Sequence, residues 1–137
     1  MNQMSSKLFF VFCASVFSTS VYAKWEHVYT NSLGDMLYVD DDTMTENIDD
    51  SNIVQAWVLT NSKKPVRAAG VSYRSMASQY EYDCQSSTSR FLQGATYSQV
   101  NQKGRVLLQY AVAEDEASPV VPNTGGHKIL QYACATD

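Results

Sequence analysis

The cysteine pair Cys84 and Cys134 is the feature that most constrains how this chain can fold. A third cysteine, Cys13, lies in an N-terminal segment with the order of a secretion signal, so we expect it to be absent from the mature protein. An exported chain that keeps two thiols is typical of a protein with one disulfide. In the chain-entropy model, closing a loop of about 50 residues stabilises a domain by roughly 4 kcal/mol. We therefore predict a disulfide between Cys84 and Cys134.

The N-terminal segment contains the three parts of a secretory signal. Lys7 supplies a positive charge, residues 8–17 form an apolar run, and Val21-Tyr22-Ala23 is a small-x-small motif that indicates a cleavage site. The apolar run has about ten residues, whereas a membrane span needs roughly 20. We predict a cleaved signal peptide over residues 1–23, one exported domain over residues 24–137, and no membrane span in that domain.

Alternating apolar and polar residues predict a domain built mainly from β-strands. Such patterns are typical of antiparallel strands with one covered face. The predicted strands span residues 25–30, 36–40, 53–60, 73–84, 90–100 and 105–112. The stripe expected to be buried on the last strand consists of Val106, Leu108, Tyr110 and Val112. Residues 61–70, which include Pro65, are expected to form a loop.

The last part of the chain predicts one helix. Thr124 is a suitable N-cap for a helix that continues to Cys134. Ile129 and Ala133 are four positions apart, so both would face the sheet. The sequence therefore predicts an α+β fold, with a single antiparallel sheet of about six strands and a C-terminal helix tied on by a disulfide.

Motifs of catalytic and metal sites are missing from the sequence. There is no C-x-x-C, and His27 and His127 are the only histidines, which argues against zinc. A nucleophilic cysteine would need a nearby base, which the sequence does not show. The acidic residues from Asp40 to Asp50 lack the spacing and glycine of a calcium loop, so we expect a solvated turn. No G-x-S-x-G, Walker or dinucleotide motif occurs, and we expect no catalytic residue, metal or cofactor.

A cluster of cations stands out because the chain has a formal net charge of −4, which argues against binding nucleic acid or anionic lipid. The candidate ligand-binding cations are Lys63, Lys64, Arg67 and Arg74. They favour contact with an acidic protein or polysaccharide, although exposed loops are also basic by chance. The candidate aromatic residues are Tyr73, Tyr80 and Tyr82. Tyrosine is enriched in interfaces, but it is equally at home on half-buried strands.

Several stretches of residues 24–137 occur in a characteristic order. They are Trp25, Leu37-Tyr38-Val39-Asp40, Ile53-Val54-Gln55-Ala56-Trp57-Val58-Leu59-Thr60, Lys63-Lys64-Pro65, Glu81-Tyr82-Asp83-Cys84, Tyr97, Gly104, Val121-Pro122-Asn123-Thr124 and Ala133-Cys134. In their order and spacing they resemble the surface-adhesin protein E family of Gram-negative bacteria. The resemblance covers essentially the whole predicted mature domain.

This resemblance implies a small exported domain with an antiparallel sheet, a C-terminal helix and one disulfide. The adhesin that gives the family its name binds host matrix and serum glycoproteins such as laminin and vitronectin, can form a homodimer, and has been linked to haem. Its basic stretch before the first disulfide cysteine is implicated in ligand contact, and the four candidate cations match that stretch in place. This chain departs from the family in lacking a lipid-anchor cysteine and much of the basic density.

We therefore expect an exported, non-enzymatic domain that binds a protein partner, as an adhesin displayed on the cell surface. The alternative is a periplasmic interaction or assembly protein that shares the fold and has no host ligand.

Overall fold

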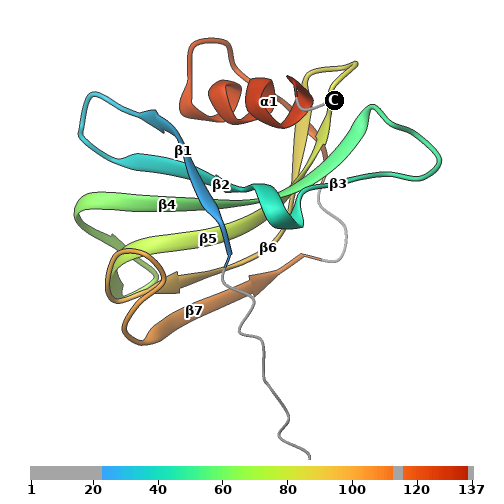
Figure 1. The fold of residues 1–137 in the computed structure, drawn as a ribbon. Helices are drawn as coiled ribbons and strands as arrows, with labels where there is room; N and C mark the ends of the chain where they lie inside the picture. Colours follow the sequence, from blue (N-terminus) through green and yellow to red (C-terminus); the bar gives the residue numbers. More distant parts are fainter. Residues whose placement is uncertain (1–22, 113–115, 136–137) are drawn as a thin grey trace, which may run out of the picture.

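The structure is a computed structural model that describes residues 23–112 and 116–135 (Figure 1). One antiparallel sheet has the strand order β1-β2-β4-β5-β6-β7. These six strands are β1 (Trp25–Thr30), β2 (Met36–Asp40), β4 (Ile53–Ala68), β5 (Val71–Asp83), β6 (Thr88–Tyr97) and β7 (Val106–Ala111). The short β3 (Thr45–Glu46) pairs with β4, and the short β8 (Ser118–Pro119) pairs with β6. The 3-10 helix η1 (Asp41–Thr43) follows β2, and α1 (Gly125–Ala135) ends the described chain.

The predicted α+β fold is confirmed, with one antiparallel sheet and a C-terminal helix. Residues 1–22 of the predicted signal peptide lie outside the described residues. The helix in the described part is too short and too polar to cross a membrane.

The core lies between α1 and one face of the sheet. Alternation along β4 buries Val54, Ala56 and Val58 on the face that carries the core. Ile129 and Ala133, four positions apart on α1, are each 1% exposed and belong to the same cluster. The predicted inward face of the helix is therefore confirmed.

The start of α1 shows why the chain has a glycine there. A Cβ atom at Gly125 would lie 3.0 Å from Leu37 Cδ2, so glycine lets the helix approach β2 closely. Just before it, Thr124 Oγ1 accepts a hydrogen bond from His127 N at 3.2 Å, as expected of an N-cap.

The disulfide predicted from the sequence is present. Cys84 directly follows β5 and is bonded to Cys134 of α1, with a Cα–Cα distance of 5.6 Å. The bond ties the last turn of the helix to the end of the longest hairpin in the sheet.

The prediction of a loop over residues 61–70 is wrong, because β4 continues to Ala68. The chain reverses in two residues, Ala69 and Gly70, whose φ angles are +48° and +76°. Positive φ at both positions is typical of the tight turn that matches the twist of a hairpin. Pro65 is accommodated because it lies in an irregular part of the ladder, between Asn61 and Val66.

The buried stripe predicted on the last strand is also wrong. Val106, Tyr110 and Val112 are 50%, 40% and 43% exposed, and Leu108 is half-buried. The helix packs against β1, β2, β4 and β5, whereas β7 is at the far edge of the sheet (Figure 1). The apolar face of β7 therefore has no helix to cover it.

A third correction concerns the acidic residues after β2. Most of the run from Asp40 to Asp50 is exposed, as expected of a solvated turn. Asp40 itself is only 3% exposed, because its carboxylate is turned inward to accept hydrogen bonds from the chain around it.

Candidate ligand-binding surface

The four candidate cations lie together in the outer half of the β4–β5 hairpin. In the β4–β5 ladder, Asn61 pairs with Ser75, and the next pair is Val66 and Tyr73. Between these pairs, β4 has four unpaired residues and β5 has one, Arg74. Lys63 and Lys64 lie within this bulge, and both side chains are exposed. Arg67 follows, also exposed, near the hairpin turn.

Arg74 holds the bulge in place. Its Nε donates to Ser62 O at 3.0 Å, and its Nη2 donates to Lys63 O at 3.2 Å. These two carbonyls have lost their cross-strand partners, so the guanidinium satisfies backbone acceptors that the bulge would otherwise leave open. The charge of Arg74 therefore lies at this surface, but its main contacts are with the backbone.

Lys63 is positioned from the other side by the β1–β2 turn. Its backbone N donates to Asp35 Oδ1 at 2.9 Å. Gly34, with φ +86°, lies beneath its side chain, since a Cβ atom there would be 2.7 Å from Lys63 Cδ. The β1–β2 turn therefore positions the backbone of Lys63 and the first part of its side chain.

The positive charges of this surface are not paired with carboxylates. The ion pairs of the described residues join Lys24 to Glu26 at 3.2 Å and Arg90 to Glu81 at 2.9 Å. Lys63, Lys64 and Arg67 take no part in these two pairs. We refer to these three residues together with Arg74 as the cationic surface.

A hollow of about 520 Å³ adjoins the cationic surface. Lys63 and Arg74 line one side of it, and Met36, Tyr38 and Val100 contribute apolar area. A bound group that joins a carboxylate or sulfate to an apolar part would match these walls.

The candidate tyrosines are not brought together. Tyr73 is paired with Val66, so it lies beside the cationic surface. Tyr80 and Tyr82 are on the face that packs against α1, and Tyr82 is 3% exposed. Burial raises the pKa of both hydroxyl groups, and the Tyr80 ring also packs edge-on against Phe91 at 5.7 Å. These two rings contribute to the core, at the opposite end of β5 from the cations.

A second hollow, of about 560 Å³, lies on the sheet face opposite the helix, and sequence reasoning missed it. Trp25 of β1 and Gln109 of β7 both line it, so the two edges of the sheet curl towards each other. Trp57 and Tyr97 add aromatic area. The pattern in β4 contains a signal for this hollow, because Trp57 must face away from the helix if Val58 faces it.

We refer to this hollow as the aromatic groove, and its wall is mainly uncharged. Its amide side chains are Gln93, Gln102 and Gln109. Gln93 Nε2 donates to Gln79 Oε1 at 2.9 Å, which fixes that amide across the β5–β6 ladder. Among the described residues, no group of three His, Cys, Asp or Glu side chains could hold a metal ion.

Comparison with known proteins agrees with this geometry. The chain belongs to the surface-adhesin protein E family, whose model matches residues 25–135. No match was found among curated proteins.

Solved structures of Haemophilus influenzae protein E share the fold. One crystal form has a TM-score of 0.63 and 17% identity, and the match covers 85% of this chain and 91% of that one. A second structure has a TM-score of 0.60 at 17% identity, with coverage of 85% and 88%. A third, from a non-typeable strain, has a TM-score of 0.58 at 17% identity, with coverage of 85% and 79%.

Proposed function

We propose that this protein is an exported, non-enzymatic adhesin that contacts acidic groups of a protein partner through the cationic surface. Membership of a surface-adhesin family favours host matrix or serum glycoproteins, such as laminin and vitronectin, as partners. The observation that carries the proposal is the exposure of Lys63, Lys64 and Arg67, unpaired with carboxylates among the described residues of an acidic chain. Exposed cations contribute little to folding, so a partner accounts for them better than stability does.

The two parts of the surface have different roles in this proposal. Exposed charges steer an acidic partner and raise its association rate, while specificity depends on close contact. The hollow beside Lys63 and Arg74 provides that contact, since Met36 and Val100 can bury apolar area next to the bound acid. Tyr73 extends the contact along β5 with area that salt does not screen.

The test is a triple variant, Lys63→Gln/Lys64→Gln/Arg67→Gln, in which Arg74 is kept because it holds the bulge. We expect an unchanged thermal midpoint and weaker binding to laminin and vitronectin, most clearly at low salt. Binding by the parent should also weaken above about 0.15 M salt, where the Debye length is about 8 Å.

A matched control removes the same number of charges elsewhere. Lys103→Gln/Arg105→Gln/Lys128→Gln changes three exposed cations outside the cationic surface. If both triple variants lose affinity equally, net charge rather than this surface determines binding. If the parent binds neither glycoprotein, the alternative of a periplasmic interaction protein replaces the adhesin.

Location is tested separately by protease treatment of intact cells. A displayed adhesin is removed by the protease, and a periplasmic protein is protected. Signal-peptide cleavage and export precede both locations, so this experiment decides between the two candidate functions and not whether the chain is exported.

The oligomeric state must be known to interpret the binding titrations, because the proposed adhesin could form a homodimer. The β7 strand offers an edge for self-association, since it is at the end of the strand order and exposes Val106 and Tyr110. Sedimentation of the parent and of Val106→Lys at the titration concentration tests this contact.

A further inference from the structure

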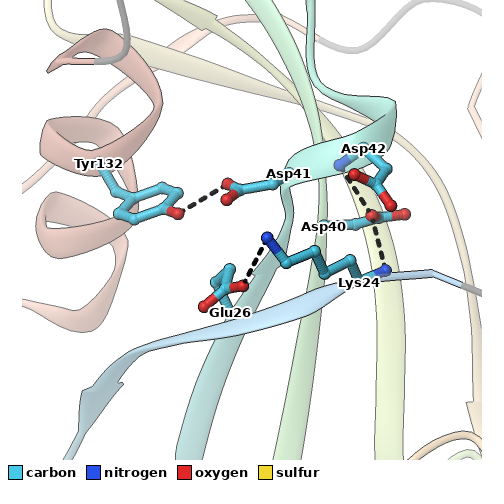
Figure 2. Close-up of polar contacts among 6 residues, drawn as sticks. All are labelled: Lys24, Glu26, Asp40, Asp41, Asp42 and Tyr132. Atoms are coloured by element: carbon cyan, nitrogen blue, oxygen red, sulfur yellow. Dashed lines mark hydrogen bonds and ion pairs between the residues drawn. The ribbon is translucent and has the colours of Figure 1, made fainter.

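Asp40 is a buried carboxylate with neutral partners. Its Oδ1 accepts from Lys24 N and from Asp42 N, both at 3.2 Å (Figure 2). Its Oδ2 accepts from Thr43 Oγ1 at 2.9 Å. The two ion pairs of the described residues do not include Asp40. A carboxylate that is 3% exposed is costly to bury without a counter-charge.

The backbone nitrogen of Lys24 is held in place from its C-terminal side. Lys24 O accepts from Asp41 N at 3.3 Å, and the next residue, Trp25, pairs with Asp40 in the β1–β2 ladder. The Lys24 side chain is also anchored, with Nζ 3.2 Å from Glu26 Oε1. These contacts do not involve residue 23, so none of them depends on the chain that precedes Lys24.

We propose that proteolytic maturation before Lys24 places a new charge at this nitrogen, and that Asp40 binds the resulting α-ammonium as a buried ion pair. Hydrolysis breaks the Ala23–Lys24 C–N bond; water supplies hydroxyl to the Ala23 carbonyl and hydrogen to the Lys24 nitrogen. The free α-amine then takes up a proton, because an α-amino group ordinarily titrates near pH 7.7–8.0. The proposal rests on the predicted signal cleavage and is independent of the adhesin function.

The surroundings of this nitrogen favour an added positive charge. Asp40 is the carboxylate bonded to this nitrogen, whereas Glu26, Asp41 and Asp42 act on the Lys24 side-chain ammonium, which is at the other end of the residue (Figure 2). Tyr132 of α1 is also present, with its hydroxyl donating to Asp41 Oδ1 at 2.6 Å. An α-ammonium would give the buried Asp40 carboxylate the counter-charge that the ion pairs of the described residues do not supply, and it exchanges a neutral donor on Asp40 for a charged one.

The site also borders the aromatic groove. Ala23, Trp25, Asp40 and Thr43 all line that hollow. Cleavage before Lys24 removes Ala23 from its wall, so maturation changes one end of the groove as it completes the ion pair.

The experiment uses the chain exported with its own signal and compares two amino termini. One protein is processed before Lys24, which mass spectrometry must confirm, and the other carries Gly-Ser inserted between Ala23 and Lys24. We expect the insertion to increase the unfolding equilibrium constant about fivefold in denaturant titrations, because a charge-assisted hydrogen bond becomes a neutral one. An unchanged constant, or processing at another bond, overturns the proposal.

Two further proteins separate the ion pair from other effects of the insertion. In Asp40→Asn, the insertion should have no effect, whereas in Asp42→Asn, which does not contact Lys24 N through its side chain, the fivefold effect should remain. Equal effects in the parent and in Asp40→Asn overturn the proposal.

An NMR titration of the labelled α-amine in the parent does not depend on whether Asp40→Asn folds. Because the Asp40 carboxylate is hydrogen-bonded to this nitrogen, the amine should titrate above its ordinary range. Titration within that range contradicts the ion pair.

Discussion

Asn61 and Asn101 are 40 positions apart in the chain and bind each other twice. Asn61 Nδ2 donates to Asn101 Oδ1 at 2.6 Å, and Asn61 Oδ1 accepts from Asn101 N at 2.8 Å. Ser75 forms a second pair of hydrogen bonds with the same turn: its Oγ donates to Gln99 O at 2.6 Å and accepts from Gln102 N at 3.2 Å. The turn between β6 and β7 is therefore bound to the face of β4 and β5, between the hollow beside the cationic surface and the aromatic groove.

The two hydrogen bonds between Asn61 and Asn101 predict a specific loss of stability. We expect Asn61→Ala to lower the free energy of unfolding by about 1–2 kcal/mol, because Asn61 is 9% exposed and its partners on the turn lose their hydrogen bonds. Asn52→Ala is the control, since Asn52 is exposed and its side-chain amide donates to nearby Asp50, and it should cost less than about 0.5 kcal/mol. If both variants lose the same free energy of unfolding in urea titrations, the Asn61–Asn101 hydrogen bonds do not stabilise the fold in this way.

Removing the disulfide should lower the stability more than removing the Asn61 hydrogen bonds does. Replacing Cys84 and Cys134 together with serine should lower the free energy of unfolding by about 2–5 kcal/mol, chiefly because the unfolded chain is no longer cross-linked. The core contacts of Ile129 and Ala133 remain, so far-ultraviolet circular dichroism should still show the helix. Loss of the helical signal at low denaturant would show that the bond, rather than packing, holds α1 on the sheet.

Most of the fold could be predicted because it depends on local patterns. Alternating apolar and polar residues identified the strands, and the spacing of Ile129 and Ala133 identified the buried face of α1. The extent of β4 could not be predicted in this way. Pro65 and two lysines usually indicate a loop, and the strand persists only because Arg74, on another strand, supplies donors to the bulged carbonyls.

The candidate site was only partly predictable for a similar reason. The cations of the β4–β5 hairpin were found because their charge is a property of the sequence itself. Burial of Asp40 depends on donors from β1 and η1, and exposure of Tyr110 depends on how far α1 reaches across the sheet. Such long-range relations are not encoded in the period of any one segment, so both residues were placed wrongly.

The two glycines at the start of α1 should respond differently to alanine. A Cβ atom at Gly126 meets nothing closer than 3.7 Å, so Gly126→Ala should stabilise the protein by about 0.5–1 kcal/mol through helix propensity. At Gly125 the same atom would lie 3.0 Å from Leu37 Cδ2, which offsets that gain. Denaturant titrations should therefore rank Gly126→Ala above Gly125→Ala; the reverse order would show that Leu37 yields freely.

The hydrogen bond from Tyr132 to Asp41 should appear as a pH-dependent contribution to stability. This bond raises the pKa of Tyr132 to about 12, from an ordinary value near 10. Between those values the unfolded chain loses the phenol proton while the folded chain keeps it. The contribution of Tyr132 is therefore complete below about pH 10 and is lost as the pH rises through about 12.

Tyr132→Phe tests this contribution, because phenylalanine keeps the ring and removes the donor. We expect a loss of about 1 kcal/mol near pH 7, at the low end for a charged acceptor because the pair is partly exposed. The difference from the parent should shrink between pH 10 and 12. Tyr38→Phe is a suitable control, since its hydroxyl meets only the weak acceptor Met36 Sδ, and its difference from the parent should be smaller at pH 7. A Tyr132→Phe difference that stays constant up to pH 12 would mean that the hydroxyl does not stabilise the fold through Asp41.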